Sequence, residues 1–177
     1  MLDQAAMFGL VPKRYNWIDE KVDFSTFYAM ARGEKAVVAC EMTKWFNTNY
    51  HYIVPEYEGQ TLRLTANYVL DYYLEAKEEL GLETKPTIIG PYTFVELAKG
   101  YDEKTKAAFL LQIIPLYAEI FTELTAAGAE WIQVEEPALV TLKNADDLKL
   151  VQEIYTQLVE AAPQAKLMLQ TYFEAVP

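Results

Sequence analysis

Short apolar, β-branched runs alternate along the chain with longer stretches whose apolar residues recur every three or four positions. The short runs predict strands and the longer stretches predict helices, and their alternation is typical of βα units that build a parallel sheet. Residues 87–89 and 167–169 are almost continuously apolar, which favours strands covered on both faces. We expect four strands, at residues 36–42, 86–90, 131–135 and 166–171.

Two long amphipathic stretches predict helices between these strands. Residues 62–80 carry a stripe of apolar residues with charges between them, and Gly81 is a suitable stop. Residues 104–127 follow Asp102, a candidate N-cap, and contain Pro115. Proline has no backbone N–H and clashes with the preceding turn, so we expect a break or kink near the residue before it.

Two more helices are expected from capping residues. Residues 145–162 follow Asn144, a good N-cap, and end before a proline. In the less regular first part of the chain, Asp23 is a plausible cap for a short helix that ends at Arg32.

A long loop, residues 43–60, follows the first expected strand and has no clear period. Loops of this length in compact domains tend to be functional or disordered. This loop contains five aromatic residues: Trp45, Phe46, Tyr50, Tyr52 and Tyr57. The aromatic content argues for an ordered loop.

The fold class expected from these elements is α/β, with about four parallel strands and intervening helices. Such a set could form an open doubly wound sheet or about half of a closed (β/α)₈ barrel. The chain has 177 residues, whereas a complete barrel needs roughly 250. Half a barrel would leave open strand edges, which native proteins seldom tolerate, so the barrel interpretation implies that the missing strands come from elsewhere.

Composition narrows the possible functions. The formal net charge is −11, which argues against nucleic acid as a partner, because phosphate binding needs an excess of Lys and Arg. One Cys and one His cannot supply the ligands of a usual zinc site. No stretch is as apolar as a membrane span, and the first residues lack the pattern of a secretory signal. We therefore expect a cytoplasmic protein with no membrane or nucleic-acid partner.

Polar residues that could bind a ligand occur where the expected strands end. This is also where parallel α/β folds bind their ligands. Lys44, Thr93, Glu136 and Thr171 follow the four strands in turn, so we expect them to converge on one rim. Lys44, beside a tryptophan in an acidic protein, is placed to hold a carboxylate or phosphate. The alternative is a solvated surface lysine paired with Glu41.

Other polar candidates have simpler structural interpretations. Glu135 and Glu136 are adjacent, so in a strand they point to opposite faces and cannot form a close catalytic pair. One of them is expected to face ligand or to be a buried carboxylate that ties neighbouring loops together. His51 could be a general acid or base, or a structural histidine packed in an aromatic loop. Cys40 is expected to be a small core residue and not a nucleophile.

Four motifs resemble those of a known family, the amino-terminal domain of cobalamin-independent methionine synthase. The motifs occur in the same order as in the family and cover nearly the whole chain. They are residues 41–52 (EMTKWFNTNYHY), 88–94 (IIGPYTF), 127–137 (AGAEWIQVEEP) and 169–173 (LQTYF).

The resemblance implies that residues 1–177 are part of one amino-terminal (β/α)₈ barrel, with no second domain in this chain. It implies a methyltransferase that moves the methyl group of 5-methyltetrahydropteroyltri-L-glutamate to L-homocysteine to form methionine, without cobalamin. The family's zinc ligands lie in a carboxyl-terminal barrel outside this chain. The tail-binding lysine of the family corresponds to Lys44. This piece would supply scaffold and part of the folate-tail site, no catalytic or metal-binding residue, and no activity in isolation.

Two other functions fit parts of the sequence. A barrel of the uroporphyrinogen decarboxylase or corrinoid methyltransferase type would share the Gly-Pro-x-Thr-Phe and Glu-Pro strand ends, but the loop at residues 43–52 argues against it. A non-catalytic α/β ligand-binding module would be a stable, cooperatively folding monomer with no exposed sheet edge.

Overall fold

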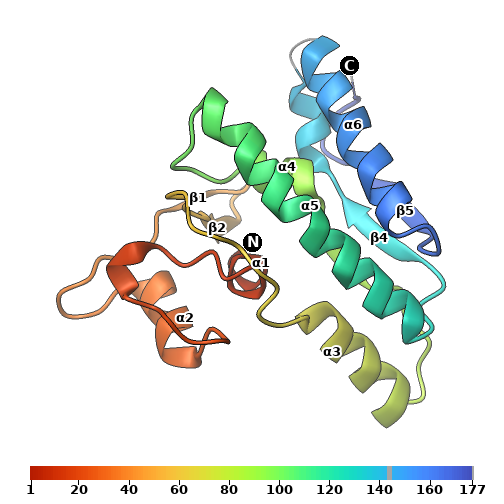
Figure 1. Cartoon of the computed structure of the whole chain (residues 1–177), viewed down its shortest axis with the longest axis horizontal. Helices are drawn as coiled ribbons and strands as arrows, with labels where there is room; N and C mark the ends of the chain where they lie inside the picture. The colour runs from red at the N-terminus through yellow and green to blue at the C-terminus, as the bar shows by residue number, and fades with distance from the viewer. Residues whose placement is uncertain (143–144, 177) are drawn as a thin grey trace. The chain divides into compact units, whose positions relative to one another are not determined.

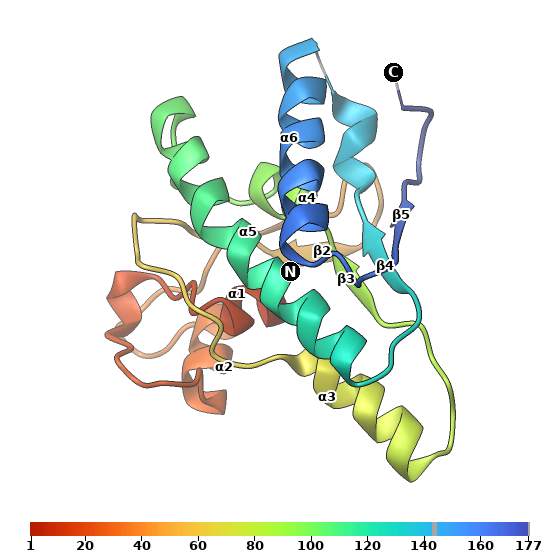
Figure 2. The ribbon, with the colours of Figure 1, turned by 45° about the vertical axis from the view of Figure 1, so that its right-hand side comes forward.

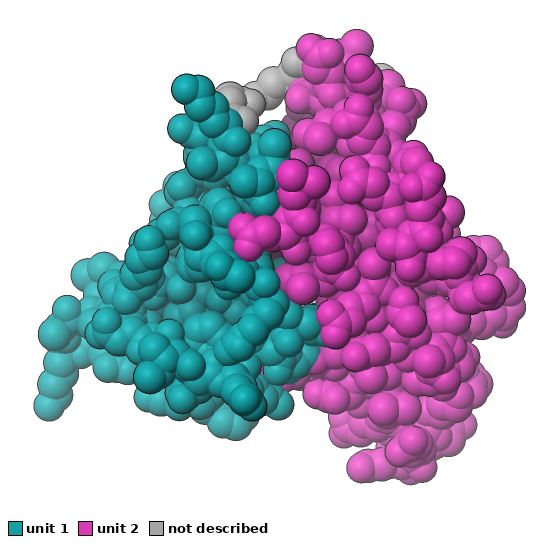
Figure 3. Space-filling model, in the orientation of Figure 1, with its two compact units in different colours: residues 1–66, 97–109 teal, residues 67–96, 110–177 magenta. Residues whose placement is uncertain are grey.

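The computed structural model describes residues 1–142 and 145–176. The chain divides into two compact units, which have different colours in Figure 3. The first unit comprises residues 1–66 and 97–109, and the second comprises residues 67–96 and 110–177. The division falls within one long helix, α5 (Glu103–Ala126).

The first unit contains short helices and a β-hairpin (Figure 1). Phe8, Met30 and Phe109 are completely or almost completely buried in it. The rings of Tyr57 and Phe109 stack in parallel with centroids 4.3 Å apart. Its elements are α1 (Leu2–Met7), the 3₁₀ helix η1 (Lys13–Tyr15), α2 (Phe24–Arg32), β1 (Met42–Lys44) and β2 (His51–Ile53).

The prediction of a first strand at residues 36–42 is wrong. A tight turn follows α2 instead, closed by reciprocal backbone hydrogen bonds between Glu34 and Val37, and the Cys40 N–H donates to the Met30 carbonyl. These bonds satisfy the backbone locally, so the segment needs no strand partner. Extended structure begins only at Met42, and β1 pairs antiparallel with β2. The part of the chain that the structure describes therefore has three parallel strands where four were expected.

The second unit is built on these three parallel strands, in the order β3 (Thr87–Ile89), β4 (Ile132–Glu135) and β5 (Leu167–Gln170). Figures 1 and 2 show α5 and α6 on the same side of this sheet. The other elements are α3 (Tyr68–Leu74), the π-helix η2 (Glu75–Glu79), α4 (Pro91–Glu96), the 3₁₀ helix η3 (Pro137–Thr141) and α6 (Ala145–Ala161). The α/β class is therefore confirmed.

Burial alternates along the central strand. Ile132 and Val134 are fully buried and face the core, whereas Gln133 and Glu135 are half-buried. The outer strand β5 is different, because Met168 is 40% exposed and Leu169 is 48% exposed. The expectation that the apolar strands are covered on both faces is therefore wrong for β5 within the described residues. Helices cover only one face there, and β5 is an edge strand.

The helices expected from capping patterns are confirmed. The Asp23 carboxylate accepts a hydrogen bond from the Thr26 N–H at the start of α2. Asp102 does the same for the N–H groups of Lys104 and Thr105 at the start of α5. The helix expected at residues 145–162 is α6, whereas its expected cap, Asn144, lies outside the described residues.

Two predictions about the helices are wrong, and the structure gives a physical reason for each. The helix expected from residue 62 begins only at Tyr68, because the backbone N–H groups of Arg63 and Thr65 donate to carbonyls at the end of α1, at Phe8 and Met7. Asn67 then caps α3 by accepting from the Leu70 N–H. A break or kink was expected near Pro115; the break is absent, because α5 continues through the proline without interruption. Complete burial of Ile113, Tyr117 and Phe121 outweighs the one backbone hydrogen bond lost there.

Residues 104–126 of α5 are long and apolar enough to cross a membrane on composition alone. More than half of the apolar window, 56%, is buried inside the protein. The Tyr117 hydroxyl also donates a 2.6 Å hydrogen bond to the Ile89 carbonyl of β3. The helix is therefore a core helix that packs on the sheet.

Candidate functional site

The β1–β2 hairpin of the first unit has one packed face and one open face. Side chains alternate between faces along a strand, and Thr43 and Tyr52 share the packed face. The Tyr52 hydroxyl donates a 3.0 Å hydrogen bond to the Leu97 carbonyl. Burial raises the pKa of Tyr52, and the nearby Glu41 charge adds to that effect. This face anchors the hairpin.

The open face carries Lys44, which is exposed and lies opposite His51 in the register. Met42 is on the same face and is 64% exposed. Among the side chains that the structure describes, none forms a hydrogen bond or ion pair with the Lys44 ammonium. The alternative partner considered for it, Glu41, instead receives both carboxylate contacts from Lys99, each at 2.5 Å. The Lys44–Glu41 pairing is therefore wrong.

The turn between the strands is held by its own hydrogen bonds. The Thr48 hydroxyl donates to the Trp45 carbonyl at 2.6 Å and accepts from the Tyr50 N–H at 3.1 Å. Phe46 adopts a left-handed backbone conformation with φ of +53°, which is uncommon for a large side chain. The Trp45 ring packs edge-on against Tyr52 with centroids 5.5 Å apart. The expectation that this aromatic segment is ordered is consistent with this network.

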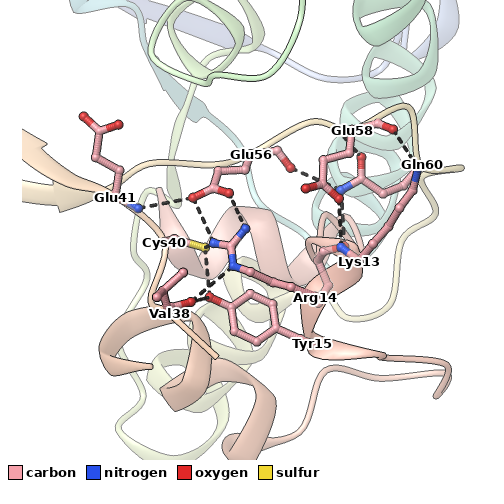
Figure 4. Close-up of polar contacts among 10 residues, drawn as sticks. Lys13, Arg14, Tyr15, Val38, Cys40, Glu41, Glu56, Glu58 and Gln60 are labelled. Atoms are coloured by element: carbon pink, nitrogen blue, oxygen red, sulfur yellow. Dashed lines mark hydrogen bonds and ion pairs between the residues drawn. The ribbon is translucent and has the colours of Figure 1, made fainter. Parts of the chain in front are cut away.

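An ion pair between Arg14 and Glu56 fixes the base of the hairpin (Figure 4). The Arg14 guanidinium donates two hydrogen bonds to the Glu56 carboxylate, at 2.5 and 3.0 Å. The same carboxylate accepts a 3.2 Å bond from the Glu41 N–H, just before β1. Burial tends to raise the pKa of Glu56, but the hydrogen bonds and charge of Arg14 outweigh it and lower the pKa below its ordinary value.

Replacing Glu56 by Gln should lower the free energy of unfolding at neutral pH by about 1–2 kcal/mol, because charge-assisted hydrogen bonds contribute about this much. The folded protein holds fewer protons on Glu56 than the unfolded chain does between the lowered pKa and 4.5. The stabilisation is therefore complete above pH 4.5 and is lost as the pH falls through the folded pKa.

Urea denaturation from pH 7 to pH 2 measures this effect. The difference between the wild-type protein and Glu56→Gln should shrink on acidification. Glu34→Gln is the matched control, because the exposed Glu34 side chain makes no ion pair with a described residue. A difference that stays constant with pH would show that the Glu56 charge does not stabilise the fold.

Cys40 lies inside this network and is 4% exposed. Its sulfur accepts a 3.3 Å hydrogen bond from Arg14 and lies 3.6 Å from the Tyr15 hydroxyl. Burial raises the pKa of the Cys40 thiol to about 11, so the thiol is protonated at neutral pH and is a poor nucleophile. The expectation of a buried cysteine is confirmed, although its neighbours are polar and it is not in a strand.

Glu136, in the second unit, is the completely buried carboxylate at the end of β4. It accepts hydrogen bonds from the Tyr92 N–H at 3.0 Å, the Thr93 N–H at 2.6 Å and the Tyr155 hydroxyl at 2.8 Å. Burial raises the pKa of Glu136, although these hydrogen bonds act in the opposite direction. Glu136 thus joins β4 to α4 and α6, as expected for a structural carboxylate.

Glu135 has different partners from Glu136: it is half-buried and accepts a 3.0 Å hydrogen bond from the Gln133 amide. The two adjacent glutamates therefore have separate surroundings, as the strand alternation predicted.

Three of the four residues expected at a common rim belong to the second unit. Thr93 contacts Glu136 directly, and its hydroxyl accepts a 3.1 Å hydrogen bond from the Ala138 N–H. Thr171 follows β5, where the Glu136 N–H donates to the Gln170 carbonyl at 2.8 Å. These three therefore gather at the carboxyl ends of β3, β4 and β5. Lys44 belongs to the first unit, so its convergence with them stays a prediction.

Sequence reasoning misjudged one residue and missed others. His51 was considered as a packed structural histidine, but it is exposed on the hairpin. Arg14, Glu56 and Tyr155 were not identified, because their partners are 42 and 19 positions away in the sequence. No periodicity or spacing brings such distant residues together before the fold is known.

The described residues do not provide a metal site. Among them, no group of three or more His, Cys, Asp or Glu side chains is placed to hold an ion. The only cysteine is buried as a thiol against a guanidinium, and the only histidine is exposed on the hairpin. This donor set does not fit the three or four ligands that zinc takes from proteins.

Comparison with known proteins identifies close relatives. A family model described as "Cobalamin-independent synthase, N-terminal domain" matches residues 1–177. Three similar proteins carry the name 5-methyltetrahydropteroyltriglutamate–homocysteine methyltransferase. The protein from Halalkalibacterium halodurans is 53% identical over 176 residues, that from Bacillus velezensis 50% over 177, and that from Listeria monocytogenes 46% over 176. Each alignment covers 99% of this chain but only 23% of the relative.

Proposed function

Because this chain belongs to the cobalamin-independent synthase family and matches its N-terminal domain, we propose that it is part of a methyltransferase that makes methionine. In the proposed reaction, the methyl group of 5-methyltetrahydropteroyltri-L-glutamate moves to L-homocysteine. The relatives that carry this activity in their names are about four times as long as the chain, which spans 23% of their length. The activity is therefore proposed for the complete polypeptide, in the cytoplasm, without a nucleic-acid or membrane partner.

The part proposed for this chain is scaffold and one contact to the folate tail. A triglutamate tail carries several carboxylates, each of which needs a cationic or hydrogen-bonding partner. Lys44 offers an exposed ammonium with no partner among the described side chains, on a hairpin that the rest of its unit holds in place. In a chain with a net charge of −11, such a cation is a favourable local site for an anion. The proposal rests on this exposed Lys44 ammonium, which has no partner among the described side chains.

The groups that react are assigned to the remainder of the protein. The described side chains do not fit zinc, so we place the zinc site in a carboxyl-terminal barrel of the same polypeptide, as the family resemblance implies. Both substrates would bind with that barrel. The isolated chain is therefore expected to form no methionine even with zinc and both substrates, and detectable methionine formation would contradict this division of labour.

We further propose that residues 1–177 form part of one (β/α)₈ barrel. Three parallel strands with helices on one side are the repeating arrangement of such a barrel. The outer strand β5 is exposed at Met168 and Leu169, and it is an edge that further strands would cover. Those strands would come from the part of the polypeptide outside this chain.

Replacing Lys44 by Ala in the complete enzyme should weaken binding of the triglutamyl substrate selectively. We expect the KM for the triglutamyl folate to rise about tenfold, which is the effect of losing one charge-assisted hydrogen bond of about 1.4 kcal/mol. The KM for the monoglutamyl folate and both kcat values should change little, because the tail is remote from the reacting atoms. Steady-state kinetics with the two folates measures the difference.

Two further variants control this experiment. Lys35→Ala removes another exposed lysine of the same unit and should leave both KM values unchanged. Lys44→Arg keeps the charge and should retain most of the preference for the triglutamyl folate. Equal losses with the two folates in Lys44→Ala would remove the role proposed for this residue.

A further inference from the structure

We infer that His51 is a second contact for the polyglutamate tail, and that Lys44 and His51 together form one anion-binding face of the β1–β2 hairpin. The inference rests on the proposed function of Lys44, because both side chains would hold the same polycarboxylate. It follows from the register of the hairpin, the exposure of both residues and the lack of an acidic residue among the described hairpin positions on their face.

The register places the two side chains next to each other. Lys44 lies directly opposite His51, and backbone hydrogen bonds join the pairs Trp45–Tyr50 and Glu41–Val54. Bonded and non-bonded pairs alternate along an antiparallel ladder, so the Lys44–His51 pair is a non-hydrogen-bonded one. In such pairs the Cα atoms are about 4.5 Å apart and both side chains leave the same face.

The chemistry of this face suits carboxylates. The Lys44 ammonium has three donors, and an imidazole keeps at least one N–H donor in either protonation state. The other hairpin residues on the face are Met42 and Ile53, which carry no charge. The nearest acid in sequence, Glu41, is held by Lys99 through both of its oxygens. Two donors side by side can therefore bind one tail carboxylate or two neighbouring ones without repulsion from Glu41.

Packing does not account for His51. Its side chain is exposed and makes no hydrogen bond or ion pair with a described residue. Its neighbour Tyr52, in contrast, anchors the opposite face through the Leu97 carbonyl. The rigid turn and the anchored face hold the strand that carries His51 in place before a ligand arrives, which limits the entropy lost on binding.

The test is steady-state kinetics of the complete enzyme with triglutamyl and monoglutamyl folate. In His51→Ala, the KM for the triglutamyl substrate should rise about three- to fivefold, less than in Lys44→Ala, because an exposed hydrogen bond to a carboxylate contributes modestly. The monoglutamyl KM and both kcat values should stay unchanged. His51→Gln keeps an N–H donor and should restore the triglutamyl KM to within about twofold of the wild-type value.

The outcomes separate this inference from the proposed function. If Lys44→Ala is selective for the triglutamyl substrate and His51→Ala is not, His51 is not a tail contact although the tail still binds at Lys44. If Lys44→Ala affects the two folates equally, the tail role of the hairpin fails altogether. An equal rise of both KM values in His51→Ala would show that the residue acts through folding, which also overturns the inference.

Met42→Ala is the matched control, because Met42 is an exposed residue on the same face that cannot bind an anion. It should leave the ratio of the two KM values unchanged. If His51→Ala does not fold, His51→Leu and His51→Gln make the same comparison, since Leu suits an exposed strand and lacks the donor that Gln keeps. Equal KM ratios in these two variants would overturn the inference.

Discussion

Replacement of Glu136 by Ala is expected to lower the free energy of unfolding by about 4 kcal/mol, because several buried donors lose their acceptor at once. The Tyr92 and Thr93 N–H groups and the Tyr155 hydroxyl all donate to this carboxylate, which has no exposed surface. Alanine leaves these donors unsatisfied and adds a cavity. Urea denaturation of the chain and thermal inactivation of the complete enzyme measure the loss.

The neighbouring carboxylate provides the control for Glu136. Glu135→Ala removes a half-buried side chain one position earlier and should cost less than about 1 kcal/mol. Glu136→Gln keeps the shape of the side chain but places an NH₂ group among donors. Its loss of unfolding free energy should therefore lie between those of Glu136→Ala and Glu135→Ala. Equal destabilisation by Glu136→Ala and Glu135→Ala would contradict the role of Glu136 in joining β4 to α4 and α6.

Replacement of Gly90 by Ala should have the second largest effect, a loss of about 3 kcal/mol. A Cβ atom at Gly90 would overlap the Glu136 carboxyl carbon and one of its oxygens. The carboxylate cannot move aside without giving up its three hydrogen bonds, so the added methyl group overpacks a rigid site. Urea denaturation measures this loss as well.

The two substitutions should not be additive, because they act on the same contact. In Glu136→Ala the clashing carboxylate is gone, so adding Gly90→Ala should cost much less than it does in the wild-type protein. Gly59→Ala is the control for a methyl group added without a clash, since a Cβ atom there would meet no atom within 4 Å. Its positive φ of +77° still costs some strain. Full additivity at Gly90 and Glu136 would contradict the steric account.

Local signals in the sequence were sufficient for most helices. Asp23 and Asp102 cap helices because a short carboxylate can reach the free N–H groups of its own first turn, and this needs no knowledge of the fold. The three parallel strands were found for a similar reason, since short apolar runs between helices have few alternatives. The α/β class was therefore predictable.

The errors arose where distant parts of the chain decide the local structure. Residues 62–66 have a helical pattern, yet two of their N–H groups donate to the Met7 and Phe8 carbonyls at the end of α1. Pro115 stays within α5 because the burial around it outweighs the lost hydrogen bond. Residues 36–40 have the apolar composition of a strand, but a turn and the Met30 carbonyl satisfy their backbone.

The candidate site was predictable in part. Lys44 was identified from its place in a family motif, and the structure adds that it is exposed and that Glu41 is held by Lys99 instead. The pairing of Lys44 with His51 depends on where the hairpin turns. The sequence shows a loop without a period there, so the register, and with it the role inferred for His51, became visible only in the fold.

A crystal structure of the complete enzyme with the triglutamyl substrate bound would test most directly whether this hairpin holds the folate tail. We expect a tail carboxylate within hydrogen-bonding distance of the Lys44 ammonium, on the face of the hairpin that also carries His51. A fully ordered tail bound elsewhere, with Lys44 directed into solvent, would contradict the central claim.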